Sequence, residues 1–319
     1  MPSKGKFAPV MLTPFTEKGA IDYNCLAKLT DYYLKAGATG LFANCLSSEM
    51  FELTEEERIA LTSFVVKETA GAVPVFSTGT FGGSLKQQAD FCKRIYDTGA
   101  AAVVATTSIL ARENETNEVL LERSHELLQL TGDIPFGFYE CPTPYKRVMP
   151  ANVLRSLVET GRIVYYKDTS LDIHSVEEKI NAAGGFPSFE LYDAYMVNAV
   201  ASLKAGCAGL SCIQGNFMPE LVSWITTHFA DPACEKQVAE VQQFFVNTMD
   251  VMHNVYPISA KYFLQSRGLP IELTTRKSAG SFSASVKKDI DQLAISYEKL
   301  QERWGTASRK NAGRGGPFF

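Results

Sequence analysis

Short apolar runs of strand length alternate with longer stretches of helical periodicity along this chain, and the alternation repeats eight times. We predict strands near Phe7–Leu12, Gly40–Asn44, Val73–Thr78, Ala101–Ala105, Pro135–Tyr139, Ile163–Tyr166, Ser188–Leu191 and Gly209–Cys212. These runs are apolar at successive positions, which is typical of a parallel sheet covered by helices on its outer face. Eight strand–helix units in about 230 residues predict an α/β fold, a (β/α)8 TIM barrel.

The boundaries of the predicted helices support this division. Helical periodicity is clearest over Tyr23–Ala36, Glu55–Ala70, Leu85–Thr98 and Glu115–Leu130. Thr54 and Glu57 fit a capping box, and glycines stand where helices should end, at Gly37, Gly71, Gly99 and Gly132. A doubly wound sheet is the weaker alternative, because no G-x-G-x-x-G motif follows the first strand.

The helical pattern continues after the eighth unit without further strands. We predict helices over Glu235–Val251, Ser259–Arg267 and Ser283–Arg303. The expected organisation is a catalytic barrel over residues 1–230, a C-terminal helical extension over 231–304 and a disordered tail over 305–319, which is rich in glycine, arginine and lysine.

Composition excludes several classes of partner. The net charge of −4 and the pI near 5.7 argue against bulk attraction to nucleic acid or anionic lipid. The apolar runs are too short to span a membrane, and the first residues do not resemble a signal peptide, so we expect a cytoplasmic protein. Seven scattered cysteines without a C-x-x-C pair predict reduced thiols and no metal site.

Two side chains stand at the ends of neighbouring predicted strands, where an α/β barrel places its reacting groups. Lys167 follows the sixth strand, and desolvation there lowers a lysine pKa toward the neutral amine that attacks a carbonyl. Tyr139 ends the fifth strand, and its phenol can move the proton that imine chemistry requires. A single lysine after a strand is more often a solvated residue at the barrel rim, and a single tyrosine there more often packs against its neighbours. A barrel that binds a ligand without catalysis therefore remains an alternative.

The motifs around these residues resemble a known family. They are Leu12-Thr13-Pro14-Phe15, Glu49 with Leu53-Thr54, Thr78-Gly79-Thr80, Tyr139-Glu140-Cys141-Pro142, Lys167-Asp168-Thr169-Ser170, and Gly209-Leu210-Ser211 with Asn216. Over about residues 7–270 the chain resembles the dihydrodipicolinate synthase / N-acetylneuraminate lyase family of pyruvate-dependent class I aldolases. The tyrosine-x-x-proline segment, followed one strand later by the K-D-T-S lysine, is the most specific of these matches.

The resemblance implies a mechanism and a set of partners. Lys167 is expected to form a Schiff base with a small-molecule 2-oxo acid, and Tyr139 to shuttle protons. Ser47 and Ser48, in the loop after the second strand, are expected to hold the substrate carboxylate. Thr169, Asp193 and Ser211 complete the expected substrate-binding set, with Lys146 and Arg147 as further candidates for the far end of the substrate. The family implies no metal or organic cofactor, and a homotetramer built as a dimer of dimers.

Departures from the family pattern argue against both the dihydrodipicolinate synthase and the N-acetylneuraminate lyase activity. Leu46 stands where the synthases carry a relay threonine, the segment 105–110 lacks the relay tyrosine, and Pro144 replaces an arginine that holds a distal carboxylate. Asp193 is kept, while the glutamate that follows it in the sialic acid lyases is Ala194 here. We therefore expect a lyase that cleaves or dehydrates a 2-oxo acid such as a 2-keto-3-deoxy sugar acid. The alternative is 4-hydroxy-tetrahydrodipicolinate synthase of lysine biosynthesis.

Overall fold

Eight parallel strands form one sheet in the computed structural model, which describes residues 4–278 and 280–308. The strands are β1 (Lys6–Phe7), β2 (Leu41–Asn44), β3 (Val75–Thr78), β4 (Ala102–Thr106), β5 (Phe136–Tyr139), β6 (Ile163–Asp168), β7 (Leu191–Asp193) and β8 (Gly209–Leu210). Their order is β1-β8-β7-β6-β5-β4-β3-β2, and a parallel bridge between Val10 and Phe42 joins the first segment to β2. The predicted (β/α)8 barrel is confirmed.

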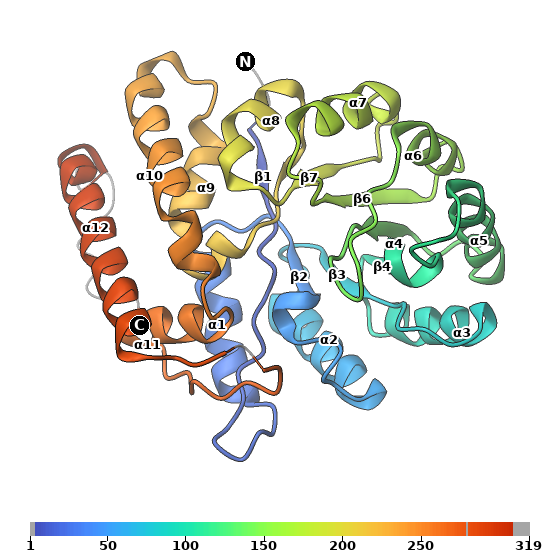
Figure 1. The fold of residues 1–319 in the computed structure, drawn as a ribbon, viewed down its shortest axis with the longest axis horizontal. Helices are drawn as coiled ribbons and strands as arrows, with labels where there is room; N and C mark the ends of the chain where they lie inside the picture. Colours follow the sequence, from blue (N-terminus) through green and yellow to red (C-terminus); the bar gives the residue numbers. More distant parts are fainter. Residues whose placement is uncertain (1–3, 279, 309–319) are drawn as a thin grey trace.

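Helices surround the sheet and continue beyond it. Around the barrel lie α1 (Tyr23–Lys35), α2 (Glu55–Thr69), α3 (Leu85–Tyr96), α4 (Thr107–Leu110), α5 (Asn117–Leu130), α6 (Ala151–Val158), α7 (Ile173–Ala183), α8 (Ala199–Ala205) and α9 (Pro219–His228). The chain ends in α10 (Glu235–His253), α11 (Ile258–Ser266) and α12 (Ala284–Ser308). Figure 1 shows these last three helices along one side of the molecule. Among the described residues, no helix has the length and apolar character needed to cross a membrane.

Local chemistry sets the ends of the helices as predicted. The Thr54 backbone N–H donates to Glu57 Oε2 at 3.0 Å, and the Glu57 N–H donates to Thr54 Oγ1 at 3.2 Å, which is the predicted capping box. The four predicted terminal glycines all have positive φ, from 62° at Gly132 to 92° at Gly99. Glycine adopts the left-handed conformation that ends a helix at little steric cost, because it has no Cβ.

Several predicted boundaries differ from the observed ones, and three of them have a clear local cause or consequence. Strand β1 ends at Phe7 instead of Leu12, because Pro9 has no N–H to donate to a strand ladder. The Phe189 N–H donates to Phe186 O in a turn, so β7 begins at Leu191 and not at Ser188. Helix α12 continues to Ser308, past the predicted start of the tail, and residues 309–319 lie outside the described residues.

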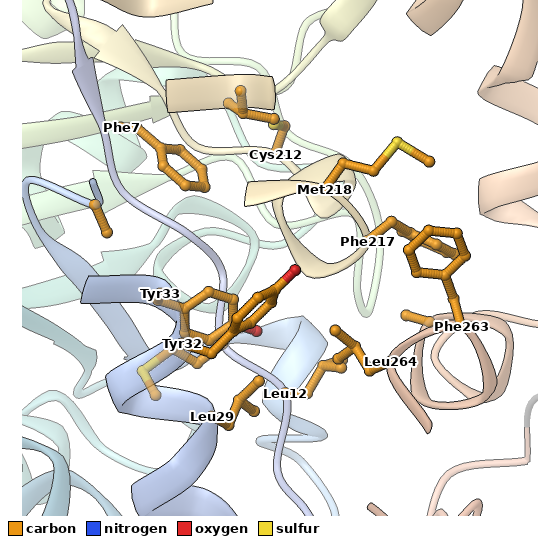
Figure 2. Close-up of a cluster of buried hydrophobic side chains, with 14 of the residues drawn as sticks. Phe7, Leu12, Leu29, Tyr32, Tyr33, Cys212, Phe217, Met218, Phe263 and Leu264 are labelled. Atoms are coloured by element: carbon orange, nitrogen blue, oxygen red, sulfur yellow. The ribbon is translucent and has the colours of Figure 1, made fainter. Parts of the chain in front are cut away.

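The C-terminal helices share an apolar core with the barrel. Figure 2 shows Phe217, which follows β8, next to Phe263 of α11, and their ring centroids are 5.5 Å apart in an edge-to-face arrangement. Leu12 and Leu29 belong to the same buried cluster. Burial of this common core stabilises the extension against the barrel, so the two parts hold each other in place.

A buried ionic network lies directly behind the ends of β5 and β6. Lys179 of α7 donates to Glu140 Oε1 at 2.6 Å and to Asp168 Oδ2 at 2.5 Å. Glu140 also accepts from the Tyr166 hydroxyl and from the Thr169 backbone N–H. Burial, together with the nearby Asp168 carboxylate, raises the pKa of Glu140. Because Glu140 follows Tyr139 and Asp168 follows Lys167, this network fixes the backbone at both predicted catalytic positions.

Lys179→Met should lower the free energy of unfolding by about 3–5 kcal/mol, because it leaves two buried carboxyls without their cation. The raised pKa of Glu140 favours its protonation in the folded state, so the folded variant binds more protons than its unfolded chain. The loss of stability should therefore be larger at pH 8 than at pH 5. Urea denaturation at both pH values measures it.

Lys204→Met, at an exposed lysine on α8, is the matched control and should change stability by no more than about 0.5 kcal/mol. A Lys179→Met variant as stable as this control would show that the network contributes little to folding.

Candidate active site

The strand register places the predicted catalytic pair on the inner face of the barrel. Tyr139 of β5 pairs with Lys167 of β6, and Lys167 pairs with Tyr192 of β7. Residues paired across parallel strands point to the same face of a sheet. Tyr139 and Tyr192 belong to the cluster that fills the barrel, together with Phe42, Phe76 and Tyr165. Lys167 therefore projects into an aromatic interior, as the sequence predicts.

The Lys167 amine is almost completely removed from solvent. Its side chain is 4% exposed, and Nζ lies 4.1 Å from the centroid of the Tyr139 ring. Burial lowers the pKa of Lys167, and the neighbouring thiols of Cys45, Cys141 and Cys212 only partly oppose this effect. A lysine in such surroundings supplies a larger fraction of neutral, nucleophilic amine near neutral pH than an exposed lysine does.

Tyr139 is protonated in these surroundings. Burial raises its pKa well above that of a free phenol, and the nearby Cys141 and Cys45 thiols act in the same direction. The Tyr139 ring also meets Phe42 edge-on, with the centroids 5.8 Å apart. A neutral phenol beside a neutral amine can begin a reaction as the proton donor.

The loop after β2 contains the short helix η1 (Leu46–Ser48), where two serines were expected to bind a carboxylate. The Ser48 hydroxyl donates within the protein, toward Met11 O at 2.7 Å and Ala43 O at 2.8 Å, and accepts from the Cys45 N–H. Ser48 therefore shapes the loop, and the expectation that it binds substrate is not supported. Ser47 is buried in the same short helix.

Thr169 does not lie on the Lys167 side of the barrel. Its backbone N–H donates to Glu140 Oε2 at 2.9 Å, and its hydroxyl donates to the Glu140 carbonyl. Both polar groups are thus engaged in the network behind the strands. The prediction that Thr169 contacts substrate is not supported, because it assumed only a position near the strand end and did not consider the direction of the side chain.

Asp193 faces outward as well. It pairs with Asp168 in the register, and Asp168 points to the opposite face from Lys167 because successive strand residues alternate. The Asp193 carboxylate accepts from the Tyr195 N–H at 2.8 Å. Burial raises the pKa of Asp193 to about 6, against the opposing hydrogen bonds from Tyr195 and from Ser202 of α8. The predicted contact between Asp193 and substrate is therefore not supported.

The remaining predicted residues divide between the two faces. Ser211 lies inside the barrel, where the Tyr165 hydroxyl donates to Ser211 Oγ at 3.0 Å. Lys146 is exposed. The Arg147 guanidinium donates to the carbonyls of Arg112, Glu115 and Thr116, so it secures the loop before α5 and is not directed at a substrate. No group of three or more potential metal ligands was found in the described part of the chain.

Sequence reasoning missed several polar groups on the inner face. Thr78 and Thr106 follow Phe76 and Val104 at two-residue spacing and are completely buried. Within the described residues, neither threonine hydroxyl has a hydrogen-bond partner. Period-two alternation could have placed both residues inside the barrel. Tyr256 was missed because it lies far along the chain from every strand, and no local pattern points to the barrel.

Comparison with known proteins agrees with this geometry. The model of the "Dihydrodipicolinate synthetase family" matches residues 3–296. A 4-hydroxy-tetrahydrodipicolinate synthase from Oceanobacillus iheyensis is 26% identical over 275 residues, which cover 84% of this chain and 88% of the relative. A relative of the same name from Bacillus velezensis is 29% identical and covers 84% of this chain and 90% of its own length.

Solved structures share the fold. YagE, a prophage protein of the dihydrodipicolinic acid synthase family from Escherichia coli K12 in complex with pyruvate, superimposes with a TM-score of 0.81 at 20% identity. The alignment covers 93% of this chain and 98% of YagE. The family match over nearly the whole chain shows that this protein belongs to the dihydrodipicolinate synthetase family and is a lyase of the class I aldolase type.

Proposed function

We propose that this enzyme is a Schiff-base lyase that cleaves or dehydrates a 2-oxo acid, with a 2-keto-3-deoxy sugar acid as the favoured substrate class. The observation that carries the proposal is the buried Lys167 amine, 4.1 Å above the ring of Tyr139 inside the barrel. YagE is described in complex with pyruvate, which is consistent with a 2-oxo acid as ligand. We also propose a homotetramer in the cytoplasm, as the family resemblance implies.

The proposed cleavage begins when neutral Lys167 adds to the keto carbon of the substrate. The resulting carbinolamine loses its hydroxyl as water after Tyr139 donates a proton, and a protonated imine forms. The Tyr139 phenolate then removes the proton of the C4 hydroxyl, the C3–C4 bond breaks, and its electron pair moves to the imine to give an enamine. An aldehyde leaves, C3 regains a proton, and water hydrolyses the imine to release pyruvate and the free amine.

The surroundings of the pair favour this chemistry over the synthase reaction. Leu46, which stands where the synthases carry a relay threonine, places a half-buried apolar side chain against the interior cluster. Ser108, in the segment that lacks the relay tyrosine, donates to the carbonyls of Cys141 and Thr143.

Two buried hydroxyls support a hydroxylated substrate. Thr78 and Thr106 face the interior on β3 and β4, and Thr106 pairs with Tyr139 in the strand register. An unpaired buried hydroxyl costs about 1–3 kcal/mol, and a substrate hydroxyl can remove that cost. We propose that these threonines bind hydroxyl groups of the sugar-acid chain beyond C3.

Treatment with pyruvate and borohydride should add a covalent mass at Lys167, found by peptide mapping. Because burial lowers the pKa of Lys167, the trapping rate should rise with pH through a midpoint below the ordinary value for lysine. Lys167→Ala should fold and form no adduct. Wild-type protein that forms no adduct, or forms it at another lysine, would contradict the proposed nucleophile.

Tyr139→Phe should lower kcat by about 10²- to 10⁴-fold, which is the usual contribution of a general acid–base group. The ring and its contacts with Phe42 remain, so thermal stability should change little. Steady-state kinetics and thermal unfolding measure the two effects. Activity within a few-fold of wild type would mean that another group moves the proton.

A panel of 2-keto-3-deoxy sugar acids, assayed for pyruvate release, should contain a good substrate, whereas condensation of pyruvate with aspartate semialdehyde should be slow. Thr106→Val should raise KM for the hydroxylated substrate by about tenfold, equivalent to about 1.4 kcal/mol. Thr106→Ser keeps the hydroxyl and is the control. Condensation as fast as the best cleavage would favour the synthase alternative.

A further inference from the structure

A short segment of the C-terminal extension crosses back to the barrel after α11. We call this segment, residues 274–277, the strap. The backbone N–H groups of Arg276 and Lys277 both donate to Glu49 Oε2, at 2.6 and 2.8 Å. Lys261 Nζ donates to Glu49 Oε1 at 3.2 Å and to a carbonyl of the strap at 2.6 Å. The buried Glu49 carboxylate is therefore held by three hydrogen bonds from the extension.

The strap is fixed to the barrel by the Arg276 side chain. Its guanidinium donates to both carboxylate oxygens of Glu57, each at 2.6 Å, and to the Gly19 carbonyl at 2.9 and 3.0 Å. Two parallel hydrogen bonds between a guanidinium and a carboxylate restrict the orientation of both groups. Glu57 also accepts from the Thr54 N–H in the capping box of α2, so its own position is fixed. The direction in which the strap presents its N–H groups to Glu49 therefore depends on this ion pair.

Glu49 transmits this constraint to η1, the short helix after β2. It ends η1 with φ of 58°, and a non-glycine residue is kept in this conformation only where its surroundings fix it. Cys45, just before η1, and Met50, just after Glu49, both belong to the buried cluster that contains Tyr139. The Tyr139 ring centroid lies 4.1 Å from Lys167 Nζ. The loop that the strap holds therefore packs, at both of its ends, into the interior cluster beside the reactive pair.

The position of η1 connects it with substrate binding. It follows the C-terminal end of β2, and α/β barrels bind their substrates at that face. In a 2-oxo acid the carbon that the amine attacks is bonded directly to the carboxylate carbon, so the carboxylate stays close to Lys167. The reacting groups themselves depend on a different anchor, because the Lys179 network fixes the ends of β5 and β6. A change at the strap should therefore alter binding more than chemistry.

We propose that Arg276 is a positioning residue. Through its ion pair with Glu57 it fixes the strap, and the strap holds η1 in the shape that binds the 2-oxo acid. This inference rests on the proposed function, because it assumes that Lys167 forms an imine with that substrate. It gives the C-terminal extension a role in substrate affinity without requiring that any of its residues touch the substrate.

The test is borohydride trapping at Lys167 over a range of pyruvate concentrations, which gives a half-saturating concentration and a maximal rate. Arg276→Met removes the guanidinium and keeps the backbone N–H. It should raise the half-saturating concentration by about three- to thirtyfold, the usual range for a residue that acts on a site through its neighbours. The maximal rate should stay within about twofold of wild type, because the reactive pair is unchanged.

Arg267→Met is the matched control. Arg267 also joins the extension to the barrel, by an ion pair with Glu220 of α9 at 2.8 Å, and its side chain is 19% exposed, against 22% for Arg276. Its loss should leave the half-saturating concentration unchanged, because this ion pair is at α9 and not at the strap. Hydrogen exchange of residues 46–50 should become faster in Arg276→Met and stay as in wild type in Arg267→Met.

A second variant removes the ion pair from the other side. Glu57→Gln keeps the side-chain oxygen that the capping box needs and removes the charge that pairs with Arg276. It should also raise the half-saturating concentration, and the double variant should rise no further than Arg276→Met alone, because both changes break one contact. Thermal unfolding confirms that each variant is folded before its rates are compared.

Each failure has a distinct meaning. If wild-type protein forms no adduct with pyruvate, the proposed function fails and this inference fails with it. If wild-type protein is trapped but folded Arg276→Met keeps the wild-type half-saturating concentration, the proposed function stands and the strap has no role in binding. An equal rise in Arg267→Met would show that any loosening of the extension weakens binding, and it would overturn the assignment to Arg276. A Glu57→Gln variant with wild-type affinity would also overturn the inference, and it does so even if Arg276→Met does not fold.

Discussion

The geometry around Lys167 depends on one buried carboxylate, that of Glu49. This residue ends η1 in a left-handed conformation with φ of 58° and is 1% exposed. Its side chain accepts from Lys261 Nζ at 3.2 Å and from the backbone N–H groups of Arg276 and Lys277 at 2.6 and 2.8 Å. A non-glycine residue is held in this conformation only where several contacts fix it. Glu49 thus connects the loop that carries Ser47 to a segment more than two hundred residues later.

The same connection explains why the C-terminal helices belong to the active site. Lys261 lies in α11, next to Tyr256, and its pKa is lowered by burial despite the attraction of Glu49. The Arg276 guanidinium forms a two-point ion pair with Glu57 and donates to the Gly19 carbonyl. Charge-assisted, bidentate contacts are geometrically demanding. They hold the extension in one position relative to the barrel.

The sequence was sufficient to predict the barrel and the proximity of Tyr139 and Lys167, for a geometric reason. The C-terminal ends of parallel strands converge, so Tyr139 and Lys167 could be placed together from periodicity and resemblance alone. For Thr169 and Asp193, nearness to a strand end did not indicate the direction of the side chain. Once Lys167 points inward, the alternation of strand residues sends Asp168 outward, and the register sends Asp193 with it. The register depends on pairing between strands, which a single sequence does not contain.

The position of Tyr256 could not be predicted for a different reason. Its hydroxyl accepts from the Asn216 amide, which also donates to the Val10 carbonyl, so this contact joins segments that lie far apart in the chain. Tyr33, Asn216 and Tyr256 are hydrogen-bonded to one another in sequence. Removal of any one of them leaves a buried donor or acceptor without its partner, which costs free energy. Tyr33, Asn216 and Tyr256 are therefore constrained together. The hydrogen bonds of Asn216 to Val10 and Tyr256 connect the first strand segment to the C-terminal extension, and no pattern local to a strand end indicates such a connection.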